Sequence, residues 1–286
     1  MPKDKLEYWN SKELGEFYYN PDEFKICNSD YLKYVGSETD GSKIKIPQGI
    51  KSCYSMFSQC ENLITAPSIP EGVKNCNHMF FCCKNLTTAP EIPECVENCM
   101  YMFYSCKSLK TAPTKIPKRV KSCNSMFDGC ENLITAPSIP EGVKNCNHMF
   151  FCCKNLKTAP EIPEGIEDCM YMFYGCENLK TVPQIPNGVK NCNHMFFGCK
   201  NLKTAPEIPE GVEICNHMFF GCESLETAPA KIPKRVKNCN SMFEGCENLT
   251  TAPEISEGVE NIINMFAGCV NLQKAPKYPK TVKWFI

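Results

Sequence analysis

The sequence predicts an α/β repeat protein, a solenoid of about ten rungs that each contribute one short parallel strand. A 23-residue unit, clearest as IPNGVKNCNHMFFGCKNLKTAPE at 185–207, recurs between Ile46 and Ala275. A unit this short forms one coil with one apolar edge, so stacking of coils must build the core. A Met-Phe pair marks every rung, at steps of 23 residues except two of 24, and its methionines are Met56, Met79, Met102, Met126, Met149, Met172, Met195, Met218, Met242 and Met265.

Composition excludes several classes of protein. The formal net charge of −1 favours neither nucleic acid nor an anionic membrane surface as a partner. The apolar runs are only a few residues long, far short of the roughly 20 that insertion across a membrane needs. The N-terminus lacks the apolar region of a secretory signal, so a chain that is complete as given is expected to start in the cytoplasm.

The 23 cysteines fall mostly into two columns. One column lies three residues before Met, the other four residues after it, and a gap in the first is filled by Ile262. Cysteines stacked at the strand spacing of about 4.8 Å are poorly placed for disulfides, which favours free thiols that pack as small hydrophobes. Four cysteines outside the columns are expected to be the exposed, reactive ones: Cys27, Cys82, Cys95 and Cys152.

No metal or cofactor is predicted. The spacing within a rung is C-x6-C, which is not a zinc motif. His194 and His217 on adjacent rungs could share a transition metal, but a pair without carboxylates is a weak signal. A catalytic Ser/His/Asp or Cys/His set and a phosphate-binding Gly loop are also missing, so the chain is predicted not to be an enzyme.

Each rung is predicted to contain a strand, a turn and a helical segment. Leu202–Ala205 and its equivalents are short, β-favouring and ended by Pro, which indicates the strand. Ile-Pro-Glu-Gly-Val suits a type I turn. The remaining segment, Val-x-x-Cys-x-x-Met-Phe-x-x-Cys-x-x-Leu, repeats apolar residues at steps of three and predicts a short α- or 3₁₀-helix. A column of Asn, replaced by Ser108 and Ser224 in two rungs, precedes the Leu and is expected to bond backbone groups in the bend.

The pattern IP-x-x-V-x-x-C-x-x-MF-x-x-C-x-N-L resembles the BspA-like, Treponema-type leucine-rich repeats. The resemblance covers residues 46 to about 276. It implies a curved, right-handed leucine-rich-repeat solenoid without enzymatic activity. Members of this family are often bacterial or protozoan surface proteins that bind host matrix or other cells, so the resemblance also implies adhesion and a place at the cell surface.

Two variable columns are the candidate binding site. The residue before each Met (the pre-Met column) and the residue after each Met-Phe pair (the post-Phe column) vary together, which is expected of neighbours on one surface. Exposed aromatic side chains in such columns indicate a site for a protein or a glycan. Rings that merely pack between rungs would give the same pattern. The candidates are Phe81, Tyr104, Phe151, Tyr174, Phe197 and Phe220 with His78, Tyr101, His148, Tyr171, His194 and His217.

The chain is expected to divide into an N-terminal capping segment, 1–45, and a solenoid, 46–286, with a short C-terminal cap. Aromatic and acidic residues before residue 46 suit a cover for the first rung. Tyr278, Trp284, Phe285 and Ile286 are expected to cover the last one. The leading hypothesis is a protein-interaction or adhesion module, and the alternative is an assembly protein that forms homo-oligomers through its solenoid ends.

Overall fold

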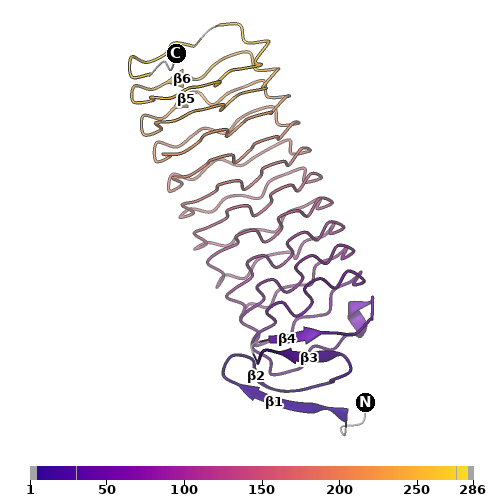
Figure 1. Cartoon of the computed structure of the whole chain (residues 1–286). Coiled ribbons are helices and arrows are strands. Elements are labelled where there is room, and N and C mark those ends of the chain that lie inside the picture. Colours follow the sequence, from indigo (N-terminus) through magenta and orange to yellow (C-terminus); the bar gives the residue numbers. More distant parts are fainter. Residues whose placement is uncertain (1–4, 30, 275, 283–286) are drawn as a thin grey trace.

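The computed structural model describes residues 5–29, 31–274 and 276–282. Figure 1 shows an elongated stack of coils, with antiparallel hairpins at the N-terminal end and the C-terminus at the far end. Equivalent residues of successive rungs form parallel bridges, as Thr65 does with Thr88 and Thr88 with Thr111. The predicted stacking of one coil on the next is therefore confirmed.

Two hairpins precede the coils. Strand β1 (Glu7–Ser11) pairs with β2 (Gly15–Tyr19), and β3 (Phe24–Cys27) pairs with β4 (Tyr31–Tyr34). The first hairpin meets the first coil at its turn, where the Lys51 amide donates to the Leu14 carbonyl at 2.7 Å. Gly15 has a φ of +91°, and a Cβ there would lie 2.5 Å from the Gly49 carbonyl oxygen, so only glycine permits this approach.

Strand β4 takes the place of a Met-Phe segment. Tyr34 stands 23 residues before Phe57, its amide donates to the Met56 carbonyl at 2.8 Å, and its ring lies 5.2 Å from that of Phe57. The same bond joins Phe57 to Met79 in the next rung, at 2.9 Å. The repeat geometry therefore reaches back to β4, before the first Ile-Pro step at Ile46.

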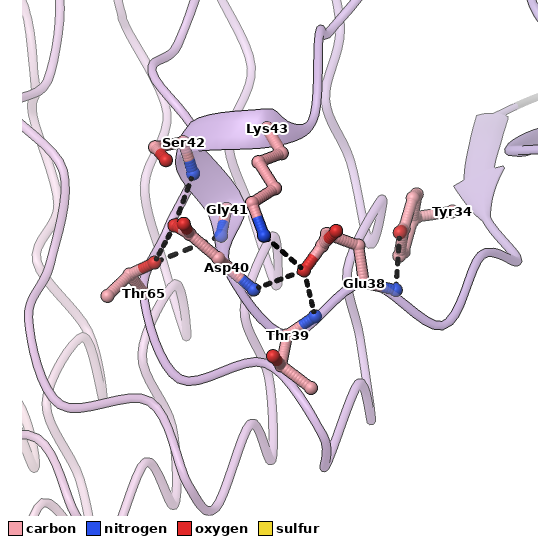
Figure 2. A network of polar contacts seen from close by, with 8 residues as sticks. All are labelled: Tyr34, Glu38, Thr39, Asp40, Gly41, Ser42, Lys43 and Thr65. Atoms are coloured by element: carbon pink, nitrogen blue, oxygen red, sulfur yellow. Dashed lines mark hydrogen bonds and ion pairs between the residues drawn. The ribbon is translucent and has the colours of Figure 1, made fainter.

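A polar network links the segment after β4 to the first rung (Figure 2). Asp40 caps the 3₁₀ turn η2 (Gly41–Lys43) by accepting from the Ser42 amide at 3.1 Å, and it also accepts from the Thr65 hydroxyl at 2.9 Å. A Cβ on Gly41 would lie 2.3 Å from the Thr65 carbonyl oxygen. Asp40 pairs with Thr65 as a parallel bridge, so this loop starts the column that the threonines continue.

The predicted helical segment is wrong: turns, not a helix, connect Val to Leu in each rung. In every rung the residue before Met has a positive φ, between 50° and 57°. The third residue after Met also has a positive φ. A helix cannot accommodate positive φ at these positions. The amides alternate between two kinds of partner. Met79 donates to Cys76 three residues back, at 3.1 Å, whereas Phe80 donates to Met102 in the next rung, at 2.9 Å. Bonds between rungs thus replace the i→i−4 bonds of a helix, and the α/β class is corrected to a mostly non-helical coil.

The predicted strand is reduced to a single parallel bridge per rung at the Thr column. Pro follows directly, and its lack of an N–H ends the ladder, as in Thr204-Ala-Pro206. The two parallel strands that reach two residues, β5 (Lys231–Ile232) and β6 (Glu254–Ile255), lie later in the rung, beyond the predicted segment. The Asn column behaves as predicted: Asn85 donates to the Glu61 carbonyl at 2.9 Å, and Asn201 to that of Glu177 at 3.0 Å.

The core is a set of continuous side-chain columns. The phenylalanine rings of the Met-Phe pairs are stacked from one coil to the next. Successive rings such as those of Phe173 and Phe196 have centroids 5.7 Å apart and nearly parallel planes. The Met, Val, Leu and Cys columns surround them and are buried. At the last rung Phe266 is half-buried on Phe243, while Val270 is 77% exposed. Of the predicted C-terminal cover, Trp284, Phe285 and Ile286 lie outside the described residues, and Tyr278 is 40% exposed.

Candidate functional site

The structure brings the twelve candidate residues together as two adjacent rows of rings, here called the aromatic ladder. All twelve are half-buried, because each ring contacts its neighbours and keeps part of its surface in solvent. The pre-Met row contains His78, Tyr101, His148, Tyr171, His194 and His217, and the post-Phe row contains Phe81, Tyr104, Phe151, Tyr174, Phe197 and Phe220.

Within each row the rings lie face to face across rungs. In the post-Phe row, centroids are 4.6 Å apart for Phe151 and Tyr174 and 4.5 Å apart for Tyr174 and Phe197, with planes within 11°. In the pre-Met row, His194 and His217 are stacked at 4.5 Å and 10°. Packing between rungs, the alternative explanation of the sequence pattern, is therefore present in the structure.

The two rows also contact each other within a rung. His78 lies 5.6 Å from Phe81, Tyr171 5.8 Å from Tyr174, and His194 5.7 Å from Phe197, all measured between ring centroids. This contact explains why the two positions vary together along the sequence. From His148 to Phe220 the double row is unbroken over four successive rungs, with eight rings held in one array.

The pre-Met row of the ladder lies on a backbone that most bulky residues rarely adopt. Tyr171 has a φ of 57° and His194 of 54°, in the left-handed region, which residues other than Gly, Asn, Asp and His seldom occupy. Bulky side chains at such positions cost of order 1 kcal/mol or more each and persist where the surroundings offset the cost. Stacked aromatic pairs contribute about 0.5–1.5 kcal/mol each, which is of the right size to do so. The spacing of apolar residues in the sequence did not indicate this backbone conformation.

Two rungs interrupt the ladder with small or acidic side chains. Ser125 and Asp128 replace the two rings in the fourth rung, and Ser241 and Glu244 replace them in the ninth. At the fourth rung the hollow has a volume of about 500 Å³ and is lined by Tyr101, Tyr104, Asn124, Ser125, Asp128, Asn147, His148 and Phe151. Burial raises the pKa of Asp128 to about 7, a change that the Ser125 hydroxyl opposes through its hydrogen bond to the carboxylate.

Three histidines of the ladder, His78, His148 and His194, are held neutral at physiological pH. Burial lowers the pKa of His78 and His148, and it lowers that of His194 to about 4, with His217 contributing a further unfavourable charge interaction. The stacked rings of His194 and His217 present their faces to each other, whereas the lone pairs that bind a metal lie in the ring planes. Among the described residues no group of three or more His, Cys, Asp or Glu side chains is placed to hold a metal ion.

The cysteine columns are buried as predicted, and the structure adds a role for the second one. Each thiol from Cys83 to Cys269 donates to the carbonyl oxygen of the Phe in the preceding rung, as Cys153 does to Phe127 at 3.2 Å. Burial raises the pKa of Cys60 and Cys269 to about 11 and that of Cys106 further still, which disfavours a nucleophilic thiolate at these positions. The four cysteines outside the columns are half-buried, as are Cys60 and Cys269 at the two ends of the second column.

The comparisons with known proteins agree with this architecture. The sequence pattern of the BspA type leucine rich repeat region, in six copies, matches residues 33–112, 91–203 and 169–284, and so includes Tyr34. No curated protein matches the chain. In the described residues no helix has the length and apolar character that crossing a bilayer requires.

Solved structures of bacterial leucine-rich repeat proteins have a similar fold. A leucine-rich repeat protein from Bacteroides ovatus is 18% identical, with a TM-score of 0.53 over 99% of this chain and 89% of that one. A leucine rich cell surface protein from Faecalibacterium prausnitzii is 20% identical, with a TM-score of 0.50 over 96% and 89%. A leucine-rich repeat protein from Eubacterium ventriosum is 16% identical, with a TM-score of 0.51 over 97% of this chain and 86% of that one. At these identities the likeness shows the fold alone, but the repeat pattern covers most of the chain, and the protein therefore belongs to the BspA-type leucine-rich-repeat family.

Proposed function

We propose that this protein is a non-enzymatic binding module that holds a protein partner on the aromatic ladder. The observation that carries the proposal is the unbroken double row of eight half-exposed rings from His148 to Phe220. Aromatic residues dominate the energetics of protein interfaces, and a contiguous row of them on a surface is a typical docking site. The family supports the same role, since leucine-rich repeats are interaction modules.

Rigidity strengthens this assignment. Rings inside the ladder are fixed between two others, as Tyr174 is between Phe151 and Phe197, so little side-chain entropy remains to be lost when a partner binds. The neutral side chains of His78, His148 and His194 add N–H groups at the ring edges without adding charge. A partner would thus contact a preorganised surface that is apolar with a few hydrogen-bonding edges.

The geometry favours a protein over a glycan. Sugars bind aromatic residues by lying on exposed ring faces, but inside the ladder the faces are covered by neighbouring rings at about 4.5 Å. Only ring edges reach solvent, and edges suit aliphatic, aromatic and carbonyl groups of a polypeptide. A sharper version of the proposal is adhesion to another cell or its matrix. It is supported by the likeness to the F. prausnitzii protein, which is described as a cell surface protein.

A capture experiment tests the proposal. The protein would be immobilised and exposed to lysates and surface extracts of candidate partner cells, and captured proteins would be identified by mass spectrometry. The test variant carries Ser at Phe81, Tyr104, Phe151, Tyr174, Phe197 and Phe220. The matched control carries Ser in place of the Thr of the same six rungs, at Thr88, Thr111, Thr158, Thr181, Thr204 and Thr227, and circular dichroism verifies that both are folded.

A partner captured by the wild type and by the Thr control, but lost from the ring variant, is the expected result. Equal capture by all three proteins would contradict a binding role for the ladder. Equal loss from both variants would show that the partner recognises the fold as a whole and not the rings.

Self-association through the solenoid ends is the second candidate function. The observation behind it is the last rung, where Val270 is 77% exposed and Phe266 is only half-buried. Sedimentation velocity over a hundredfold range of concentration would detect such assembly. Val270→Asp should abolish it, whereas Phe197→Ser, in the middle of the stack, should not. A single monomeric species at all concentrations would remove this alternative.

A further inference from the structure

The ladder contains one gap with aromatic walls on both sides. In the fourth rung Ser125 and Asp128 stand where other rungs carry rings, while Tyr101 and Tyr104 lie on the preceding rung and His148 and Phe151 on the following one. These side chains line the hollow of about 500 Å³, here called the Asp128 slot. Tyr101 is fixed there by Asn124, whose side-chain amide donates to the Tyr101 hydroxyl at 3.0 Å.

The slot has the width of one flat group. Successive rings of the post-Phe row are 4.5–4.8 Å apart, as between Phe81 and Tyr104 or between Phe197 and Phe220. Tyr104 and Phe151 lie two rungs apart with Asp128 between them, so a planar group placed in the gap would take the place of the missing ring. The faces of Tyr104 and Phe151 that border the gap are not covered by another ring, unlike the faces inside the ladder.

The floor of the slot carries a carboxylate without a cationic partner. No Lys or Arg lines the hollow among the described residues. The titratable groups that face Asp128 are neutral at physiological pH: the pKa values of Tyr104 and of the thiols of Cys130, Cys152 and Cys153 are raised, and burial lowers that of His148. Ser125, itself 4% exposed, supplies one hydrogen bond to the carboxylate. Because burial raises the pKa of Asp128 to about 7, a cation that entered the slot would favour the ionised form of the carboxyl group and meet no competing cation there.

The other interruptions of the ladder lack this combination. In the ninth rung Glu244 has His217 and Phe220 on one side only, because the tenth rung carries Asn264 and Ala267. In the first rung Ser55 and Ser58 carry no charge. Within the repeat array, two aromatic walls and an acidic floor thus occur together only at the fourth rung.

We propose that the Asp128 slot binds the guanidinium group of an arginine side chain presented by the protein partner. Guanidinium is planar, stacks on aromatic faces and carries a fork of N–H donors that matches a carboxylate. In the slot its plane would lie between Tyr104 and Phe151 and its N–H groups would reach Asp128. A lysine ammonium offers the charge but neither the flat shape nor the fork, so arginine is the better occupant.

The inference rests on the proposed function, because the slot is part of the ladder, but it can be tested without the natural partner. The probe is the capped tripeptide acetyl-Gly-Arg-Gly-amide, titrated into the full chain and followed by NMR shifts of the Tyr104 and Phe151 ring protons. Matched peptides carry lysine or citrulline, the neutral isostere of arginine. Binding should follow the order arginine, lysine, citrulline, with at least a tenfold difference between the first and the last.

Three variants locate the site. Asp128→Asn should weaken binding of the arginine peptide at least tenfold, and Glu244→Gln, the control at the equivalent position of the ninth rung, should leave it unchanged. Ser125→His combined with Asp128→Phe copies the fifth rung, fills the slot with rings and should abolish binding while the fold is kept. Binding that is equal for the arginine and citrulline peptides, or that survives the filled slot, would overturn the inference.

The two proposals fail in different ways. If the proposal of an arginine site alone failed, a partner would still be captured by the other rings of the ladder. If the six-ring variant still captured its partner while the arginine peptide bound the slot of the wild type, the ladder would not be the docking surface and the slot would stand as a separate site.

Discussion

Tyr174 and Phe197, on successive rungs, lie face to face with ring centroids 4.5 Å apart and planes 11° apart. This one contact serves both the fold and the surface. It stabilises the contact between two successive coils, and it holds the solvent-exposed edges of the two rings at a regular spacing. Stability and binding therefore depend on the same residues but should respond differently to mutation.

Truncation of a ladder ring should cost less stability than truncation of a core ring beside it. Phe197→Ser removes two stacking contacts from a half-buried position and should lower the free energy of unfolding by about 2 kcal/mol. Phe196→Ala, at a fully buried position of the same rung, should cost about 3–5 kcal/mol. Thermal unfolding followed by circular dichroism compares the two. Equal losses would mean that the ladder is simply a second core.

The left-handed positions make a prediction about backbone strain. Gly198 has a φ of +69°, and a Cβ there would meet only the Gly175 backbone, with Cα at 3.8 Å and N at 4.0 Å, which is ordinary contact. Gly198→Ala should therefore destabilise by about 1–2 kcal/mol through conformation alone. Cys152 occupies the equivalent place with a φ of +54°, so Cys152→Gly should raise the melting temperature and Cys152→Ser should not. A lower melting temperature for Cys152→Gly would argue against strain at this column.

The thiol hydrogen bonds can be measured by comparing two cysteines of one rung. The Cys176 thiol donates to the Phe150 carbonyl at 3.1 Å, whereas the Cys169 thiol, unlike its backbone, makes no hydrogen bond among the residues described. Both are fully buried, so replacement by Ala removes the same volume from each. Cys176→Ala should cost about 1 kcal/mol more than Cys169→Ala, the net worth of one hydrogen bond. Equal costs would show that both columns serve as packing only.

Asp128 should make stability depend on pH in a defined direction. Its folded pKa is raised to about 7 from an ordinary 3.8, so the folded protein holds a proton that the unfolded chain has released between these values. The contribution of Asp128 to stability is therefore full below about pH 3.8 and is lost as pH rises through about 7. Asp128→Asn should raise the melting temperature at pH 8 more than at pH 5. An equal effect at both pH values would contradict burial of the carboxylate.

The sequence predicted the stacking, the cysteine columns and the neighbouring rows of the ladder, because each depends on which residue recurs every 23 positions. The joint variation of positions such as His194 and Phe197 was sufficient to place them side by side. Backbone conformation was not predicted, since apolar residues at steps of three are equally consistent with a helix and with consecutive turns. One signal was available: Gly occupies the third position after Met in six rungs, as at Gly198 and Gly221, and a column of Gly indicates positive φ.

The start of the array was also hidden. Strand β4 lacks the Met-Phe pair, so the sequence pattern does not reveal Tyr34 as part of the array. Only its spacing of 23 residues to Phe57 agrees with the repeat. The Asp128 slot could not be predicted either. Ser125 and Asp128 were apparent as variations in two columns, but only the stacking of Tyr104 on Phe81 and of Phe151 on Tyr174 shows that a gap one group wide lies between them.

Ring edges of the ladder are proposed to contact a protein partner. The most direct test is the affinity of a captured partner for two variants, each with one substitution in the same rung. Phe197→Ser removes a ring from the middle of the unbroken row, and Thr204→Ser changes the Thr column of the same rung. The dissociation constant should rise about tenfold or more for Phe197→Ser, as expected of an aromatic residue at an interface, and should stay unchanged for Thr204→Ser. An unchanged dissociation constant for Phe197→Ser would contradict the account.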